Sequence, residues 1–281
     1  MIEARHELVQ DGGAGFADAV AVHIWLPERA SFAGLVIERR PAEATSSAAA
    51  LILAGGAPAA QASVDDAPLV EDWGEAHAGP VALRTIEPLR HWTAALETTN
   101  AAIDCELRAS GPAVEITHVP GLSRYAHLAA VEGRVTIGGK ETRVRGQALR
   151  THSWGTRTDA RRRFVTAAAE DGALVEVAAD RPRGSDAHGD ELVGGEILDA
   201  QDWAGPLEHV RLSTVYGADG IPRKAGLELY RPGDEFPARL SGEAVGGATM
   251  EIGGSTRTLA FFGWSLAGRP AWGTYELESA T

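Results

Sequence analysis

Apolar and polar residues alternate along many short stretches of this chain. In residues 102–108, Ile103, Cys105 and Leu107 fall on one side of an extended backbone and the charged residues fall on the other. A period of two is typical of a strand with one face on a core and the other in solvent. The same alternation recurs at 224–230 and, less regularly, at 81–87, 209–215 and 257–262. The pattern predicts antiparallel strands in both halves of the chain.

Turn signals separate these segments, and helical periodicity is weak throughout. Glycine pairs and Gly-Pro or Asp-Gly steps recur between the apolar runs. The alanine-rich stretch 46–54 is the nearest approach to a helix, and it is equally compatible with a buried strand. We therefore expect an all-β protein of short strands, arranged as barrels or sandwiches. The expected domains are residues 1–150 and 151–281, each with about eight strands at roughly 8 to 12 residues per strand.

Composition and charge restrict the partners of the chain. The 281 residues include 26 Lys and Arg against 39 Asp and Glu, a formal charge of −13. This balance argues against nucleic acid or an anionic membrane as a partner. No apolar run reaches the roughly 18 to 20 residues of a membrane span, and the first residues lack a signal-peptide pattern. We expect a soluble, cytoplasmic monomer or homodimer.

Two further features receive simple interpretations. Cys105 is the single cysteine, so an intramolecular disulfide is impossible, and its place in an alternating segment predicts a small buried apolar residue. The basic cluster 161–163 is too short to be a tail and is interpreted as the solvated rim of a loop.

The densest chemistry lies in residues 150–157, which read Arg-Thr-His-Ser-Trp-Gly-Thr-Arg. His152 and Trp154 are two positions apart, so on a strand they point the same way, with an imidazole nitrogen beside an indole face. Such a pair suits the stabilisation of a cation. The alternative is structural: a buried histidine that joins two domains, a tryptophan that fills their junction and a glycine that admits a bulge.

Four segments, 87–92, 127–139, 146–157 and 268–276, together resemble the tandem-lipocalin family of AttH-like proteins and carotenoid 1,2-hydratases (hydroxyneurosporene synthases). Lipocalin-like Diels–Alderases are more distant relatives. The resemblance implies two tandem lipocalin-like (calycin) β-barrel domains, with a ligand cavity in a barrel mouth or at their junction. The family usually reads Gly-x-Gly-x-Arg-Asp before the His-Ser-Trp-Gly element, whereas residues 146–151 lack the second glycine and the aspartate.

The resemblance also implies roles for particular residues. The carotenoid hydratases use a His-x-Trp pair and a later Tyr-x-Asp, with a carboxylic acid that protonates an isolated double bond and water that captures the cation. By this resemblance His152 orients or deprotonates water, Trp154 covers the cation, and Asp180 donates the proton. Ala178 stands where the family has tyrosine, which weighs against the carotenoid reaction itself. Glu276 is a second candidate acid, or the salt-bridge partner of Arg150 or Arg157.

Other candidates concern binding. Tyr125 and His127, two apart, either line the cavity or form an exposed pair, and Trp92 and Trp272 either line it or pack in the core. The segment 186–191 contains metal-capable side chains without paired histidines and is interpreted as a solvated turn. We therefore expect neither a metal nor a cofactor.

Two functions of different class follow. The first is a cofactor-independent enzyme that hydrates, dehydrates, isomerises or cyclises a hydrophobic isoprenoid, polyene or polycyclic molecule. The second is a non-catalytic lipocalin-type binder or carrier of a hydrophobic metabolite. An enzyme predicts that His152 and a carboxylate converge inside the cavity, whereas a carrier predicts an apolar cavity with those groups engaged in packing or salt bridges.

Overall fold

The structure is a computed structural model that describes residues 2–26, 31–116, 119, 121–182, 184–185, 190–199 and 204–280. Most of the segment 186–191, considered above for metal binding, lies outside the described residues. Within the described residues the chain consists of antiparallel strands and two short 3-10 turns, η1 (Ala4–Glu7) and η3 (Pro41–Glu43). The expectation of an all-β fold is confirmed.

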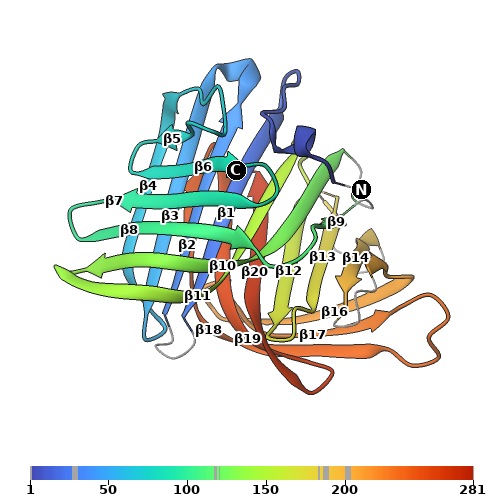
Figure 1. The fold of residues 1–281 in the computed structure, drawn as a ribbon. Helices are drawn as coiled ribbons and strands as arrows, with labels where there is room; N and C mark the ends of the chain where they lie inside the picture. The colour runs from blue at the N-terminus through green and yellow to red at the C-terminus, as the bar shows by residue number, and fades with distance from the viewer. Residues whose placement is uncertain are drawn as a thin grey trace. The chain divides into compact units, whose positions relative to one another are not determined.

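The first sheet curls into a barrel-like shape in the order β4-β3-β2-β1-β11-β10-β8-β7-β6-β5. In Figure 1 the strands β6, β7 and β8 cross over β2 and β3, so the sheet folds back on itself. The strands from the N-terminal part of the chain are β1 (Phe16–Leu26), β2 (Ser31–Arg40), β3 (Thr45–Ala54), β4 (Ala57–Pro68), β5 (His77–Ala78), β6 (Val81–Glu87), β7 (His91–Glu97), β8 (Ala101–Ala109), β9 (Val114–Ile116), β10 (Leu122–Ile137) and β11 (Lys140–Thr156).

The second sheet has the order β15-β14-β13-β12-β20-β19-β18-β17-β16 and is curled in the same way. Its strands are β12 (Arg161–Ala169), β13 (Leu174–Arg181), β14 (Leu192–Leu198), β15 (Ala204–Pro206), β16 (His209–Tyr216), β17 (Pro222–Tyr230), β18 (Ala238–Ile252), β19 (Ser255–Leu266) and β20 (Arg269–Ala280).

The chain divides into two compact units. Unit 1 comprises residues 1–113, 121–157 and 250–254, and unit 2 comprises residues 114–120, 158–249 and 255–281. The expected division between residues 150 and 151 falls within β11, and the point at which two independently folding domains separate stays a prediction.

Alternation along the strands builds the core of each unit. In β8, Ile103, Cys105 and Leu107 are buried while Asp104 and Glu106 are exposed, as the period of two predicts. These side chains join an apolar core in unit 1, and unit 2 has a core of its own. The alanine-rich stretch 46–54 is the buried strand β3, since small side chains allow close packing on both faces.

The basic cluster 161–163 is the beginning of β12 and not a loop rim, so that interpretation was wrong. Arg162 is 6% exposed and its Nε lies 3.6 Å from a carboxylate oxygen of Asp180. Arg163 is largely buried and pairs with Glu191. Carboxylates distant in the sequence therefore neutralise two of the three arginines, and a run of like charges gives no sign of such partners.

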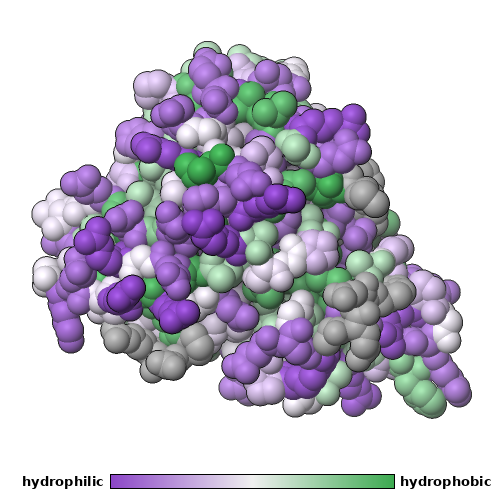
Figure 2. Space-filling view, viewed as in Figure 1, coloured by the Kyte–Doolittle hydropathy of each residue, from purple (hydrophilic) through white to green (hydrophobic). Residues whose placement is uncertain are grey.

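Few large apolar side chains are exposed among the described residues, and Phe236, at 76%, is the most exposed of these. On the face shown in Figure 2, hydrophobic residues form small separate areas among hydrophilic ones. No helix among the described residues is long and apolar enough to cross a membrane.

Close strand approach requires glycine at Gly273 in β20, so Gly273→Ala should lower the free energy of unfolding by about 1 to 3 kcal/mol. A Cβ at this position would lie 1.8 Å from the carbonyl oxygen of Thr166 on β12. Gly263→Ala in β19 is the matched control, because nothing lies within 4 Å of its Cβ position. Urea unfolding of both variants checks this, and equal losses of stability would contradict it.

Candidate functional site

The pairing of β10 with β11 places the predicted residues together. Tyr125 lies opposite His152, and His127 lies opposite Arg150. Residues two apart on one strand share a face, so Arg150, His152 and Trp154 project to the same side. The strand register therefore gathers aromatic, cationic and titratable side chains at one end of the unit 1 barrel.

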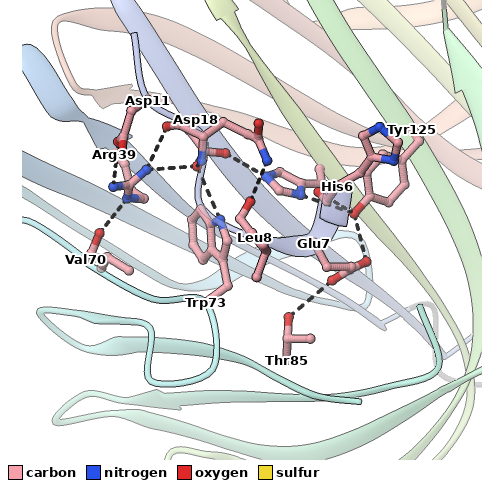
Figure 3. Close-up of polar contacts among 12 residues, drawn as sticks. His6, Glu7, Leu8, Asp11, Asp18, Arg39, Val70, Trp73, Thr85 and Tyr125 are labelled. Carbon is pink, nitrogen blue, oxygen red and sulfur yellow. Dashed lines mark hydrogen bonds and ion pairs between the residues drawn. The ribbon is translucent and has the colours of Figure 1, made fainter. Parts of the chain in front are cut away.

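The turn η1 brings a carboxylate to this cluster from outside the sheet. Its last residue, Glu7, is 2% exposed, whereas the next residue, Leu8, is 58% exposed. The Glu3 amide donates to Nδ1 of His6 at 2.8 Å, which closes the turn. In Figure 3 the Glu7 side chain points from this turn toward Tyr125 and Thr85.

Four side chains from the barrel hold the Glu7 carboxylate. The two terminal nitrogens of Arg150 lie 2.9 and 2.7 Å from its two oxygens. Tyr125 donates its hydroxyl at 2.8 Å, Trp92 its indole N–H at 3.2 Å, and Thr85 its hydroxyl at 3.3 Å. The Arg150 guanidinium also lies 5.0 Å from the centre of the Trp92 ring. The pair is buried, and these donors satisfy both carboxylate oxygens.

His152 is fully buried between a carboxylate and a phenol. Its Nε2 lies 2.6 Å from Oδ1 of Asp18 on β1, and its Nδ1 lies 3.2 Å from the Tyr125 hydroxyl. Both partners are side chains. The histidine therefore belongs to a continuous hydrogen-bonded chain that runs from Asp18 to Glu7.

The second oxygen of Asp18 is also fully engaged (Figure 3). It accepts hydrogen bonds from Nη1 of Arg39 at 3.0 Å, from Nε1 of Trp73 at 3.3 Å and from the backbone N–H of Gln10 at 2.8 Å. Arg39 is 1% exposed and also donates to the carbonyl oxygen of Val70 at 2.5 Å. Asp18 is thus fixed in place and presents Oδ1 to the histidine.

The numbers of hydrogen-bond donors and acceptors limit which atoms carry the protons in the hydrogen-bonded series from Asp18 to Glu7. Asp18 accepts only, so Nε2 of His152 carries a hydrogen. The Tyr125 hydroxyl has one hydrogen and three acceptors within reach, Glu7 at 2.8 Å, Nδ1 of His152 at 3.2 Å and the His6 carbonyl oxygen at 3.4 Å. If it donates to Glu7, Nδ1 must carry a hydrogen for its own bond, and the ring is an imidazolium. If it donates to Nδ1, the ring is neutral. The direction in which the Tyr125 hydroxyl donates, to Glu7 or to His152, therefore depends on whether Nδ1 of His152 carries a proton.

Burial sets the charge of the neighbouring groups. Burial alone would raise the pKa of Glu7, but Arg150 and the Tyr125 hydroxyl hold it below its ordinary value. Burial raises the pKa of Tyr125, so the phenol is neutral. Burial, assisted by the positive charge of Arg150, lowers the pKa of His127 to about 4. At neutral pH the site thus contains an ionised Glu7, a neutral phenol and a neutral His127.

Trp154 is the partly exposed edge of the cluster. Its ring lies 5.0 Å from the His152 ring at 60° and stacks on His6 at 6.1 Å and 15°, measured between centroids. His127 is 2% exposed and packs against Trp92 at 5.3 Å. Nδ1 of His127 has no hydrogen-bond partner among the described residues. Tyr125 and His127 are buried, so the exposed pair considered above is excluded.

The remaining predicted residues belong to unit 2. Asp180 in β13 is 9% exposed and pairs with Arg162. Trp272 in β20 is 3% exposed, with its ring 6.4 Å from that of Phe261. Glu276 is half-buried in β20, opposite Phe164. These three are not part of the unit 1 cluster, and their roles stay predictions.

The arginines of the 150–157 segment have partners other than Glu276. Arg150 pairs with Glu7, as described, and Arg157 pairs with Glu38. Each arginine therefore has a carboxylate partner within unit 1, and the expected salt bridge of Glu276 stays a prediction. Both carboxylates lie more than 110 residues earlier in the chain, and spacing near the motif does not reveal them.

Sequence reasoning missed Glu7, Asp18, Arg39 and Trp73. Asp18 carried a signal, because it is a lone acid in the apolar run 16–22, where an unpaired charge is costly. Glu7 carried none, since it lies in a polar N-terminal stretch.

An apolar cavity of about 290 Å³ lies elsewhere in unit 1. Ile24, Phe32, Ile52 and Val135 contribute to its wall, with Lys140 among the few polar lining residues. His152 does not line it. Among the described residues no group of three or more His, Cys, Asp or Glu side chains is placed to hold a metal ion.

The two curled antiparallel sheets define a tandem lipocalin-like protein, as the resemblance implied. Residues 2–280 match the family described as a domain of unknown function, DUF7064, and the chain belongs to that family. Comparison with curated proteins found no matching sequence.

Solved structures share the fold at low sequence identity. A putative AttH from Nitrosomonas europaea has a TM-score of 0.71 and 15% identity over 93% of this chain and 91% of that one. Kievitone hydratase from Nectria haematococca has a TM-score of 0.71 and 12% identity over 100% and 93%. CghA with Sch210972 has a TM-score of 0.61 and 12% identity over 94% and 88%. The neighbours of this fold thus include a hydratase.

The buried His127 makes the stability of the protein depend on pH. Its pKa is about 4 in the folded chain against 6.5 ordinarily, so the unfolded chain takes up the proton first as the pH falls. Stability should therefore decrease from pH 6.5 to pH 4, by about 3 kcal/mol from this residue. Glu7 acts in the same direction, at a pH below its ordinary value of 4.5.

Replacement of the imidazole by a phenyl ring in His127→Phe should remove the part of this dependence that lies between pH 6.5 and 4. Urea unfolding at intervals of pH measures the slope for the wild type and the variant. Equal slopes in this window would show that His127 does not titrate between the folded and unfolded states in this way.

Proposed function

We propose that this protein is a cofactor-independent enzyme that acts on a hydrophobic small molecule by hydration, dehydration, isomerisation or cyclisation. The supporting observation is the buried chain Asp18–His152–Tyr125–Glu7, in which an imidazole is held between a carboxylate and a phenol. An oriented imidazole with a defined hydrogen-bond partner on each nitrogen is suited to proton transfer.

Each group of this chain has a distinct role in the proposal. Asp18 fixes the ring orientation and keeps a hydrogen on Nε2. Because the Tyr125 hydroxyl contacts both groups, its oxygen can take the proton from Nδ1 of the imidazolium as its own hydroxyl proton passes to Oε1 of Glu7. The phenol then stays neutral, the imidazole becomes neutral and Glu7 becomes a carboxylic acid. His152 thus gains or loses a proton at Nδ1 without a change in its contact with Asp18.

Trp154 is the part of the cluster that a substrate meets first, because His152 is fully buried and the indole is only half-buried. The imidazole of His6 stacks on this indole. Displacement of His6 by a substrate would open the indole face and bring the substrate close to His152. An indole face stabilises a developing cation. The assignment of Asp180 or Glu276 as a proton donor rests on the family resemblance alone and stays a prediction.

The similarity to kievitone hydratase supports water addition as the first reaction to test. That enzyme shares the fold over the whole of this chain. The family resemblance of the His-x-Trp element supports the same choice, whereas Ala178 in place of tyrosine favours a substrate other than a carotenoid.

The second candidate is a binder or carrier of a hydrophobic metabolite. The apolar cavity of about 290 Å³ favours it, because this cavity does not include His152. A carrier needs only such a cavity, and the ion pairs of the polar cluster then close the other part of the barrel.

Turnover distinguishes the two candidates. We expect the wild-type protein to change the mass or isomeric form of at least one compound in a panel of isoprenoids, polyenes and polycyclic molecules that includes kievitone. Tyr125→Phe and Asp18→Asn should each reduce the rate by about 100-fold or more, because proton transfer through His152 is impaired. Mass spectrometry and chromatography of the products measure this.

Tyr230→Phe is the matched control and should keep the wild-type rate, because Tyr230 lies in β17 of unit 2. Thermal unfolding of each variant separates loss of activity from loss of the fold. Binding of panel compounds without any conversion would favour the carrier. Full activity in folded Tyr125→Phe and Asp18→Asn would remove the proposed relay.

A further inference from the structure

Unit 2 contains a cavity that the proposed catalytic cluster does not use. Its volume is about 650 Å³, within the usual range for small-molecule sites. It lies at the end of the sheet where β12 begins and β13 ends, because Arg163 and Arg181 both line it. A second cavity of about 330 Å³ has Arg163, Arg181, Glu191 and Tyr216 in common with it. The two spaces therefore adjoin the same arginines.

The charge at this cavity is opposite to that of the protein. The larger cavity is lined by three arginines, Arg163, Arg181 and Arg211, and by one carboxylate, Glu191. The chain as a whole carries a formal charge of −13. Arg163 pairs with Glu191, and Arg211 pairs with Glu228. Arg181 is therefore the lining guanidinium that leaves a positive charge at this cavity. A positive charge at a cavity of an acidic protein attracts an anion to this place.

The N–H groups of the Arg181 guanidinium are available to a ligand. Among the residues that the structure describes, it has neither an ion-pair nor a hydrogen-bond partner, although it is partly buried. Arg163 pairs with Glu191, and its Nε is buried without a hydrogen-bond partner in the described part of the chain. A guanidinium presents five donors in a fixed plane, which matches the oxygens of a carboxylate or phosphate.

Two hydroxyl groups hold the Arg163 guanidinium in place. Nη1 of Arg163 donates to the hydroxyls of Tyr275 at 3.3 Å and Thr214 at 3.4 Å, and these two hydroxyls lie 2.7 Å apart. Burial raises the pKa of Tyr275, although Arg163 acts in the opposite direction, so the phenol is neutral. Val193, Val210 and Leu212 supply an apolar wall to the same cavity.

A buried arginine of unit 1, Arg150, has a carboxylate partner and can be compared with Arg181. There Arg150 receives the carboxylate of Glu7, which comes from outside the sheet and contacts both terminal nitrogens. In unit 2 no described side chain supplies such a carboxylate to Arg181. A partly buried cation gains stability when an anion reaches it, and none of the described residues brings one to Arg181.

We propose that this end of unit 2 is a binding site for a small organic oxyanion, a carboxylate or phosphate attached to an apolar group. Arg181 and Arg163 hold the oxyanion, and Val193, Val210 and Leu212 contact the apolar group. The site goes beyond the proposed catalytic activity, since it lies in unit 2 and its occupancy does not require turnover.

Calorimetric titration of the full-length protein tests the site with benzoate and phenyl phosphate, at constant ionic strength. Inorganic phosphate and benzyl alcohol separate the charged and apolar contributions. Both aromatic anions should bind more tightly than benzyl alcohol or inorganic phosphate. Arg181→Gln should weaken binding of the anions by about tenfold or more, the effect of one charge-assisted hydrogen bond.

Two further variants make the result specific. Glu191→Gln should tighten anion binding, because it removes the carboxylate that competes for Arg163. Arg269→Gln is the matched control: Arg269 begins β20, at the opposite end of the strand from residues 277–279 of the smaller cavity, and pairs with Asp171. It should leave the affinity unchanged.

Three outcomes would overturn the proposal. The first is aromatic anions that bind no better than benzyl alcohol, and the second is equal effects of Arg181→Gln and Arg269→Gln. The third is inorganic phosphate that binds as tightly as phenyl phosphate, which would remove the apolar part of the site. Circular dichroism of each variant confirms that the fold is retained. None of these outcomes bears on turnover, so the site and the catalytic proposal fail separately.

Discussion

The Glu7–Arg150 ion pair is the interaction on which the polar cluster of unit 1 depends. Both side chains are almost fully buried, and each oxygen of the carboxylate has an arginine nitrogen within 3 Å. Loss of one member would leave a buried charge without a partner, which typically costs about 3 to 5 kcal/mol. The contact also joins η1, which lies outside the sheet, to β11. The ion pair therefore holds the N-terminal segment against the barrel and keeps the Glu7 carboxylate ionised.

A second buried pair repeats this arrangement around His152. Asp18 contacts Arg39 through one oxygen and His152 through the other. Because Arg39 and Trp73 hold the carboxylate from the opposite side, the imidazole meets an acceptor whose position is already set. Asp18 is oriented by its ion pair with Arg39, and Tyr125 is oriented by its hydrogen bond to Glu7. Asp18 and Tyr125 in turn orient the His152 ring, which lies beside the half-buried Trp154.

The sequence predicted the elements and part of the site for identifiable reasons. The period of two along residues 102–108 reports burial directly, so the strand and the buried Cys105 were predictable. His152 and Trp154 were predictable as neighbours from their spacing of two on one strand. Tyr125 was not predictable as a neighbour of His152, because the strand register that joins β10 and β11 is not written in either strand alone. Arg162 and Arg163 were misinterpreted, since their carboxylate partners lie 18 and 28 residues further along the chain.

Nuclear magnetic resonance of ¹⁵N-labelled histidine side chains tests the central claim most directly, with His152→Gln used to assign the His152 signals. The account predicts that Nε2 of His152 carries a hydrogen that exchanges slowly with water, since it is buried and bonded to Asp18 at 2.6 Å. Asp18→Asn should change this signal. An unprotonated Nε2 in the wild-type protein would contradict the hydrogen-bonded chain from which the proposed function is argued.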